Sequence, residues 1–206
     1  DYSRAAKTPY EVAALLEANV LGARGHLAAE RAFRAGASEF EIGLEFMKAC
    51  GLREQGLPYN PIIALNEGGA VLHYQVQARH APAKLHSLLI DAGAEFAGYA
   101  SDITRTYSYN DAEFAGIIRG FDQLQLKVCA QVRAGVDWRG FHQASYRAIS
   151  EYLKEIGVIN VGADEAIDNA LTSVFYPHGI GHLLGIQVHD VGGRQRGASA
   201  GEIGRP

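Results

Sequence analysis

Residues 85–107 read LHSLLIDAGAEFAGYASDITRTY, and this stretch contains two aspartates, Asp91 and Asp102. The run before Asp91 is almost entirely apolar, as in a strand that is covered on both faces. Residues 101–109 are rich in β-branched and aromatic side chains, as in a second strand. A hairpin that turns at Phe96 and Ala97, with Gly98 supplying permissive dihedral angles, places Asp91 directly opposite Asp102. Cross-strand partners have Cβ atoms about 5 Å apart.

Two carboxylates at this separation have a charge problem. They cannot both stay ionised unless something positive lies between them, so they either share a proton or bind a cation. Asp91 ends an aliphatic strand, where an isolated carboxylate is costly to bury. Arg105 projects to the face opposite Asp102 and does not solve the problem. The alternative is a different strand register, in which both aspartates are turn or cap residues.

Three histidines follow within twelve residues near the end of the chain: His178, His182 and His189. The five glycines at positions 179, 181, 185, 192 and 193 argue against a helix and for close approach of the backbone to something else. Imidazole is a common metal ligand and a general acid or base near neutral pH. If residues 187–191 form a strand, His189 and Asp190 project to opposite faces. The alternative is that each histidine is a hydrogen-bonded core or surface residue.

The remaining histidines carry less information. His73 lies on a predicted extended piece, residues 70–74, that follows a turn at residues 66–69. The other four are interpreted as structural or surface residues: His26, His80, His86 and His142.

The surrounding pattern predicts helices on either side of a small sheet. Thr8, Pro9 and Glu11 form a capping-box pattern that begins a helix ending near residues 35–36. Ser38 and Glu41 repeat the pattern for a helix that ends near residues 50–51. Residues 62–65 are predicted as a short buried strand, and residues 111–135, 137–157 and 164–174 as helices. Helices that flank a mostly antiparallel sheet define the α+β class.

Composition narrows the function class. The 206 residues are 48% hydrophobic with a formal net charge of −4, and charges of both signs are interspersed, which argues against a nucleic-acid partner. Cys50 and Cys129 have no metal-binding or disulfide spacing and are interpreted as reduced thiols. The longest fully aliphatic run, residues 88–90, is far too short to cross a bilayer, and the first residues do not resemble a signal peptide. We therefore expect a soluble, cytoplasmic protein without a membrane partner.

The two ends of the sequence both look atypical. The chain begins at Asp1 rather than at methionine, and residues 1–7 are polar like a linker. Residues 194–206 are loop-like. We expect an internal piece of a longer protein, with residues 1–206 forming part of one catalytic domain.

Together the motifs resemble a known family. The segment from Asp91 to Thr106, with Asp102 inside it, resembles the two-aspartate motif of the pita-bread metallopeptidases. The runs PHGIGH at residues 177–182 and VHDVGG at residues 188–193 resemble their histidine motif. The pattern KTPYE at residues 7–11, with Ala18-Asn19 and Gly25-His26, is similar to the first catalytic helix of the proline-dipeptidase branch. The order and spacing agree from about residue 7 to residue 193.

The resemblance implies an α+β pita-bread fold with a curved, mostly antiparallel sheet, and a centre of two divalent metal ions. It implies that Asp91, Asp102 and His182 are metal ligands and that Asp102 bridges both ions. His178 and His189 then contact the substrate and the tetrahedral intermediate as catalytic residues, and His73 lines the substrate pocket. Oxygen-rich ligation with one imidazole suits Mn²⁺, with Co²⁺ or Zn²⁺ as competitors. Such a pair of ions activates a water and polarises the scissile carbonyl, and a positioned histidine can donate to the developing oxyanion.

The departures from the family pattern matter as much. The resemblance implies two glutamate ligands and a substrate-binding arginine beyond the histidine motif, and an amino-terminal domain before it. Glu202 is the only carboxylate after Asp190, and it lies in the loop-like tail without the family context. The arginine is assigned to no residue here, and we expect the amino-terminal domain to lie outside this sequence. We therefore expect the fold to be truncated at its carboxyl-terminal end, and these 206 residues alone to bind Mn²⁺ weakly and to show little or no peptidase activity.

For the parent protein, the resemblance implies a homodimeric metallopeptidase that hydrolyses Xaa-Pro dipeptides, with organophosphorus ester hydrolysis as a side activity. Alternatives within the fold are an Xaa-Pro aminopeptidase and a creatinase-like hydrolase. A non-enzymatic binding module of the same fold and a metal-free hydrolase with an Asp–His pair are further alternatives.

Overall fold

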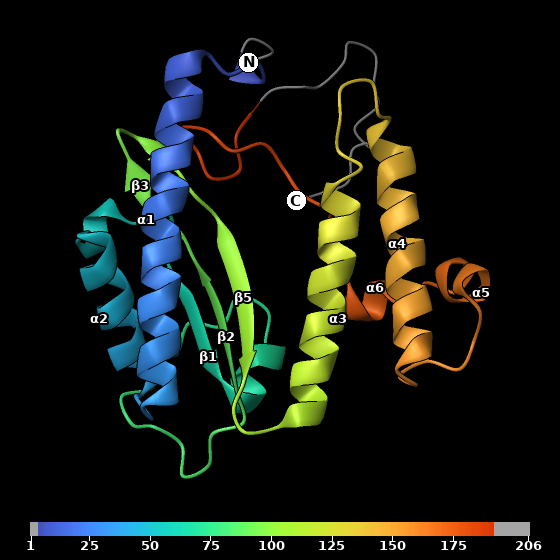
Figure 1. Ribbon diagram of the computed structural model, residues 1–206, viewed down its shortest axis with the longest axis horizontal. Coiled ribbons are helices and arrows are strands. Elements are labelled where there is room, and N and C mark those ends of the chain that lie inside the picture. The colour runs from blue at the N-terminus through green and yellow to red at the C-terminus, as the bar shows by residue number, and fades with distance from the viewer. Residues whose placement is uncertain (1–3, 192–206) are drawn as a thin grey trace. The chain divides into compact units, whose positions relative to one another are not determined.

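The computed structural model describes residues 4–191, which form helices and short antiparallel strands (Figure 1). The chain divides into two compact units. The first contains the residues up to Asp111 together with the segment that begins at Leu183, and the second runs from Ala112 to His182. The expected tail, residues 194–206, lies outside the described residues. No helix within residues 4–191 has the length and hydropathy needed to cross a membrane.

Two capped helices begin the first unit. In α1 (Pro9–Arg34), the Thr8 hydroxyl accepts a hydrogen bond from the Glu11 amide, and the Glu11 carboxylate accepts one from the Thr8 amide. Ser38 and Glu41 form the same capping box at the start of α2 (Glu39–Cys50), which ends at Gly51 in the left-handed conformation. Both predicted helices are confirmed, because a capping box satisfies free amide groups through residues that are adjacent in sequence.

The sheet of the first unit has the strand order β1-β2-β5, and all pairs are antiparallel. Its strands are β1 (Ile62–Leu65), β2 (Ser87–Ala92) and β5 (Ile103–Ser108). In β2, Leu88, Ile90 and Ala92 are fully buried in the core that also contains Phe33 of α1 and Phe46 of α2.

The residues between these buried positions in β2 are only half-buried. The prediction that both faces of this strand are covered is therefore wrong for one face. Because alternate side chains in a strand point to opposite faces, Asp91 lies on the face directed away from α1 and α2.

The hairpin after β2 turns one residue later than predicted. Strands β3 (Glu95–Phe96) and β4 (Tyr99–Ala100) pair Phe96 with Tyr99, so Ala97 and Gly98 form the turn, with φ angles of 51° and 83°. Positive φ at both central positions gives the turn the twist that a two-residue hairpin needs.

The later turn shifts the register of the long strands by two residues. Asp91 therefore pairs with Thr104 and not with Asp102, which corrects the predicted register. A shift of two residues, unlike a shift of one, keeps every side chain on its predicted face of the sheet.

A buried carboxylate explains why residues 70–74 are not extended as predicted. Ala70 ends a 3-10 helix, Asn66–Ala70, and residues 71–74 lie in a loop that carries His73. The Glu39 carboxylate is buried and accepts hydrogen bonds from the Leu65 and Ala78 amides and from the Tyr74 hydroxyl. These bonds hold the segment as a loop.

The second unit consists of helices. They are α3 (Ala112–Cys129), α4 (Trp138–Glu155), α5 (Ala163–Asp168) and α6 (Leu171–Phe175). Asp137 caps α4 as predicted, accepting from the Gly140 amide at 2.7 Å. A small core of buried residues, Ile149, Leu153, Ile159 and Ala166, joins α4 to α5.

Two helix boundaries in this unit differ from the prediction. The α3 helix ends at Cys129 rather than near residue 135, because the amides of Gln131 and Val132 bond three residues back and tighten the last turn. The helix predicted over residues 164–174 is interrupted at Ala170, whose φ angle of 55° is left-handed.

Candidate metal centre

The two aspartates of the hairpin are joined by a third side chain. The hydroxyl of Tyr59 lies 2.7 Å from Oδ1 of Asp91 and 2.8 Å from Oδ1 of Asp102. Asp91 and Asp102 are therefore brought to one place on the sheet, although they are not direct cross-strand partners. No sequence motif indicated Tyr59, which precedes Asp91 by 32 residues.

The charges of Asp91 and Asp102 beside Tyr59 favour the binding of a cation. Burial raises the pKa of Asp91, and the nearby negative charge of Asp102 raises it further. Burial also raises the pKa of Tyr59, as do both carboxylates, so its hydroxyl stays protonated. A phenol has one proton to donate, so it cannot hydrogen-bond fully to both carboxylates at once. A divalent cation would compensate the excess negative charge, and carboxylate oxygens suit such an ion.

A glycine makes room for the tyrosine. A Cβ atom at Gly93 would lie 2.0 Å from the carbonyl oxygen of Ser101 and 2.8 Å from Cε1 of Tyr59. Both contacts are too short for real atoms, so only glycine permits this approach. The backbone between the two aspartates is therefore shaped around the Tyr59 ring.

A buried histidine supports the same backbone. His26 of α1 is 4% exposed, and its Nε2 lies 3.0 Å from the carbonyl oxygen of Ala92, the residue after Asp91. Burial lowers its pKa, so the ring stays neutral near neutral pH. His26, which the sequence analysis interpreted as a structural or surface residue, is buried and contacts the backbone next to Asp91. It is not among the candidate ligands.

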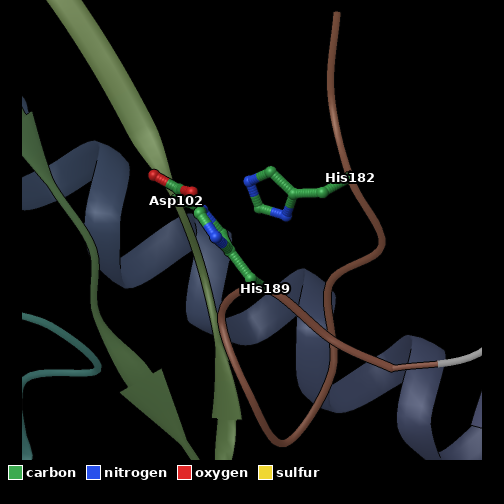
Figure 2. Close-up of side chains that lie close together, drawn as sticks. All are labelled: Asp102, His182 and His189. Atoms are coloured by element: carbon green, nitrogen blue, oxygen red, sulfur yellow. The ribbon is translucent and has the colours of Figure 1, made fainter. Parts of the chain in front are cut away.

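The histidine-rich segment approaches Asp102. Figure 2 shows the side chains of Asp102, His182 and His189 directed toward one another. One possible ligand atom from each lies within 4.8 Å of the others. His182 is the last residue of the second unit and is joined by a peptide bond to Leu183 of the first.

The segment itself is not the strand considered for residues 187–191. Residues 185–189 form bends, and the Gly185 amide donates to the carbonyl oxygen of Gln187 at 3.1 Å. The predicted alternation of His189 and Asp190 across a sheet therefore does not apply. The prediction of a non-helical, glycine-rich segment is confirmed for residues 177–191.

The structure brings some of the predicted site residues together and leaves others apart. Asp102 belongs both to the Tyr59 cluster and to the group with His182 and His189, whereas Asp91 belongs only to the first. His178 is an exposed residue of the second unit, and His73 is exposed in the loop after the 3-10 turn, with a φ angle of 53°.

Comparisons with known proteins identify the family of the chain. The chain matches the model of metallopeptidase family M24 over residues 13–204. Xaa-Pro dipeptidases from Stenotrophomonas maltophilia (strain K279a) and Xanthomonas axonopodis pv. citri are 48% and 49% identical to it, over 100% of this chain and 47% of theirs. The chain thus spans about half the length of the curated relatives it matches.

Solved structures give the same result for the fold. Zinc-substituted aminopeptidase P from E. coli, in complex with product, superimposes with a TM-score of 0.82 and 29% identity, over 93% of this chain and 44% of that one. The aminopeptidase PepP of Pseudomonas aeruginosa gives a TM-score of 0.85 and 30% identity, over 95% of this chain and 45% of that one. The chain belongs to metallopeptidase family M24 and has its pita-bread fold.

Proposed function

We propose that the complete protein, meaning this sequence with any flanking sequence in its gene, hydrolyses Xaa-Pro dipeptides in a metal-dependent reaction. One observation carries the proposal: Asp91 and Asp102 share the hydroxyl of Tyr59 on one face of the sheet. Relatives that are 48% identical over the whole chain are Xaa-Pro dipeptidases, which favours this substrate class.

In this proposal Asp91, Asp102 and His182 hold divalent metal. The donor set, two carboxylates and one imidazole, favours Mn²⁺, with Co²⁺ and Zn²⁺ as competitors. A pair of such ions supplies an activated water nucleophile and polarises the scissile carbonyl. The two glutamate ligands implied by the family resemblance are assigned to no residue of this chain.

The chain's own side chains have separate tasks. Tyr59 hydrogen-bonds to both aspartates and fixes the orientation of their carboxylates. His189, close to Asp102, and His178 contact the substrate, and an imidazole N–H donates a hydrogen bond to the oxyanion that develops on the scissile carbonyl. His73 lines the substrate pocket.

Two substitutions in the complete protein test these roles. Asp102→Ala should abolish metal binding and activity together, because it removes the carboxylate common to both clusters. His189→Ala should keep the metal, measured by elemental analysis, and lower kcat by roughly 10²–10³-fold, as loss of a hydrogen-bond donor to an oxyanion does. Equal loss of metal in both variants would instead make His189 a ligand and contradict its proposed role.

A second candidate function is an Xaa-Pro aminopeptidase that acts on longer peptides, because the solved structures named above are aminopeptidases P. The two candidates differ in the length of peptide that they accept. Hydrolysis of Gly-Pro, compared with that of a tripeptide with proline in second position, separates them. Preference for the tripeptide would overturn the dipeptidase proposal.

Two finer expectations belong to the same proposal, a homodimeric complete protein and a cytoplasmic location. Light scattering on the purified complete protein tests the first. Fractionation of the source cells tests the second.

A further inference from the structure

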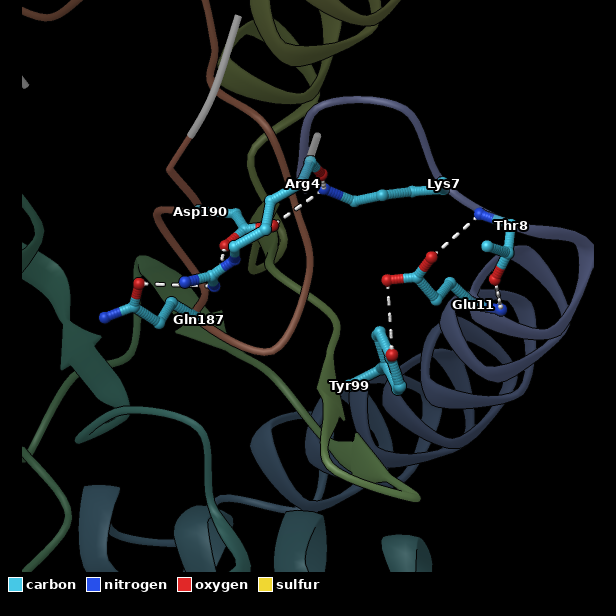
Figure 3. A network of polar contacts seen from close by, with 7 residues as sticks. All are labelled: Arg4, Lys7, Thr8, Glu11, Tyr99, Gln187 and Asp190. Atoms are coloured by element: carbon cyan, nitrogen blue, oxygen red, sulfur yellow. Dashed lines mark hydrogen bonds and ion pairs between the residues drawn. The ribbon is translucent and has the colours of Figure 1, made fainter. Parts of the chain in front are cut away.

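A buried ion-pair cluster lies directly beside His189. The carboxylate of the next residue, Asp190, is 2% exposed and contacts two cations from the segment before α1 (Figure 3). Lys7 Nζ lies 2.7 Å from its Oδ2, and the guanidinium of Arg4 pairs with its Oδ1. Lys7 is itself only 12% exposed. Most ion pairs on a protein surface are far more hydrated than this cluster.

The backbone around Asp190 is folded back on itself. The Asp190 amide donates to the Leu183 carbonyl at 2.9 Å. The carboxylate lies against Gly185, where an added Cβ would be 2.0 Å from Oδ2 of Asp190. Residues 183–190 therefore form a closed loop with the Asp190 carboxylate packed against its inner side.

The same loop is attached to the metal-site hairpin. The amide of Ala100 in β4 donates to the Gly185 carbonyl at 3.0 Å, two residues before Asp102. A parallel contact runs from the start of α1, because the Glu11 carboxylate accepts from the Tyr99 hydroxyl at 3.3 Å (Figure 3). The pre-helix segment, the hairpin and the histidine loop thus form one ring of polar contacts.

We propose that Asp190 is a positioning residue for His189, and that Arg4 and Lys7 are the counter-ions that keep its carboxylate in place. The proposal rests on the proposed function, since it concerns the same reaction. A buried carboxylate that loses its counter-ions is costly, so the pairs confine the loop to the one arrangement that provides them. The peptide bond between His189 and Asp190 passes this constraint to the imidazole.

Kinetics of the complete, metal-loaded protein test the proposal. Asp190→Asn and Lys7→Met should lower kcat roughly 10–100-fold, as loss of an orienting partner does. We expect KM and the bound metal to stay within about threefold, because neither residue contacts the proposed ligand carboxylates. Lys7→Arg should recover most of kcat, since it restores the charge. The matched control is Lys48→Met, which removes a lysine from an exposed ion pair with Glu45 on α2.

Amide hydrogen exchange tests the loop without any need for activity. In Lys7→Met and Asp190→Asn, peptides covering residues 183–190 should exchange faster, whereas peptides from α2 should not change. Lys48→Met should leave both unchanged. If Asp190→Asn does not fold, the Lys7 variants decide alone.

The outcomes separate this proposal from the proposed function. If the wild-type protein cleaves no Xaa-Pro peptide, the proposed function fails, while exchange in residues 183–190 still decides the role of Asp190. Lys7→Met behaving as Lys48→Met in both measurements would overturn the positioning role. Equal damage from Lys7→Arg and Lys7→Met would overturn the role of the charge.

Discussion

At the scale of single residues, Tyr59 contacts both aspartates of the proposed metal centre. Its hydroxyl has one proton and two carboxylate neighbours, both within 2.8 Å. The ring reaches this position because Gly93 leaves space for it. The backbone at Gly93 therefore determines where the Tyr59 hydroxyl meets the two carboxylates of the proposed metal centre.

We expect Tyr59→Phe in the complete protein to lower kcat/KM roughly 10–100-fold, because the two aspartates lose the hydrogen bonds that orient them. Steady-state kinetics with Gly-Pro and calorimetric titration with Mn²⁺ measure the effect. Tyr152→Phe is the matched control, since its hydroxyl donates to the Ile117 carbonyl within the second unit. An equal effect of both substitutions would mean that Tyr59 has no special role in the site.

The two cysteines provide a second residue-scale prediction. Burial raises the pKa of Cys50 to about 11, and its side chain is nearly inaccessible, whereas Cys129 is exposed. Because the thiolate is the reactive form, iodoacetamide at pH 8 should alkylate Cys129 quickly and Cys50 only after unfolding. Mass spectrometry of the alkylated peptides measures both rates. Fast modification of Cys50 in the native protein would contradict its burial.

At the scale of elements, the sequence predicted best the helix ends that depend on contacts between neighbouring residues. The capping boxes at Thr8 and Ser38 gave the starts of α1 and α2, since their partners lie three residues away. The hairpin register was wrong by two residues, because Ala97 adopts a positive φ angle that its residue type does not indicate.

The candidate site was predictable only in part, because some of its contacts join residues that are far apart in the sequence. The motifs gave Asp102 and the histidine segment, but the contact of Tyr59 with Asp102 spans 43 residues and has no local pattern. The loop that carries His73 was missed because a buried carboxylate on α2, that of Glu39, determines its shape.

The close approach within the hairpin makes a prediction at this scale. In the complete protein, Gly93→Ala should abolish Mn²⁺ binding and lower the free energy of unfolding by about 1–3 kcal/mol, because the new methyl group overlaps Ser101 and Tyr59. Gly36→Ala is the control, since Gly36 has a φ angle of 86° and no atom within 4 Å of an added Cβ. That change should cost about 1–2 kcal/mol for the left-handed backbone and leave Mn²⁺ binding intact. Calorimetry and chemical denaturation measure both quantities.

At the scale of the whole molecule, the first unit is discontinuous in sequence. It consists of residues up to Asp111 and the segment that begins at Leu183, and the second unit lies between them in the chain. Of the proposed ligands, Asp91 and Asp102 lie in the first part of this unit, whereas His182 immediately precedes its second part.

We therefore expect the 206-residue chain alone to bind Mn²⁺ only weakly and to show little or no peptidase activity, because three protein ligands leave the dinuclear site incomplete. Isothermal titration of this chain, beside the complete protein, measures the difference. Two tight sites on the 206-residue chain would contradict the assignment of ligands.

The ion pairs at Asp190 have a consequence for synthesis on the ribosome. Its contact with Arg4 joins residues 186 positions apart, whereas β1, β2 and β5 form their ladders within residues 62–108. At about 5–20 residues per second, roughly 4–16 s pass between the emergence of Asp111 and that of Asp190. During this interval the sheet residues and both cations, Arg4 and Lys7, have been synthesised, whereas their carboxylate partner Asp190 has not. Among the described residues of the first unit, the histidine loop is therefore the last to be synthesised, and its contacts with the segment before α1 can form only after residues 112–182 have been translated.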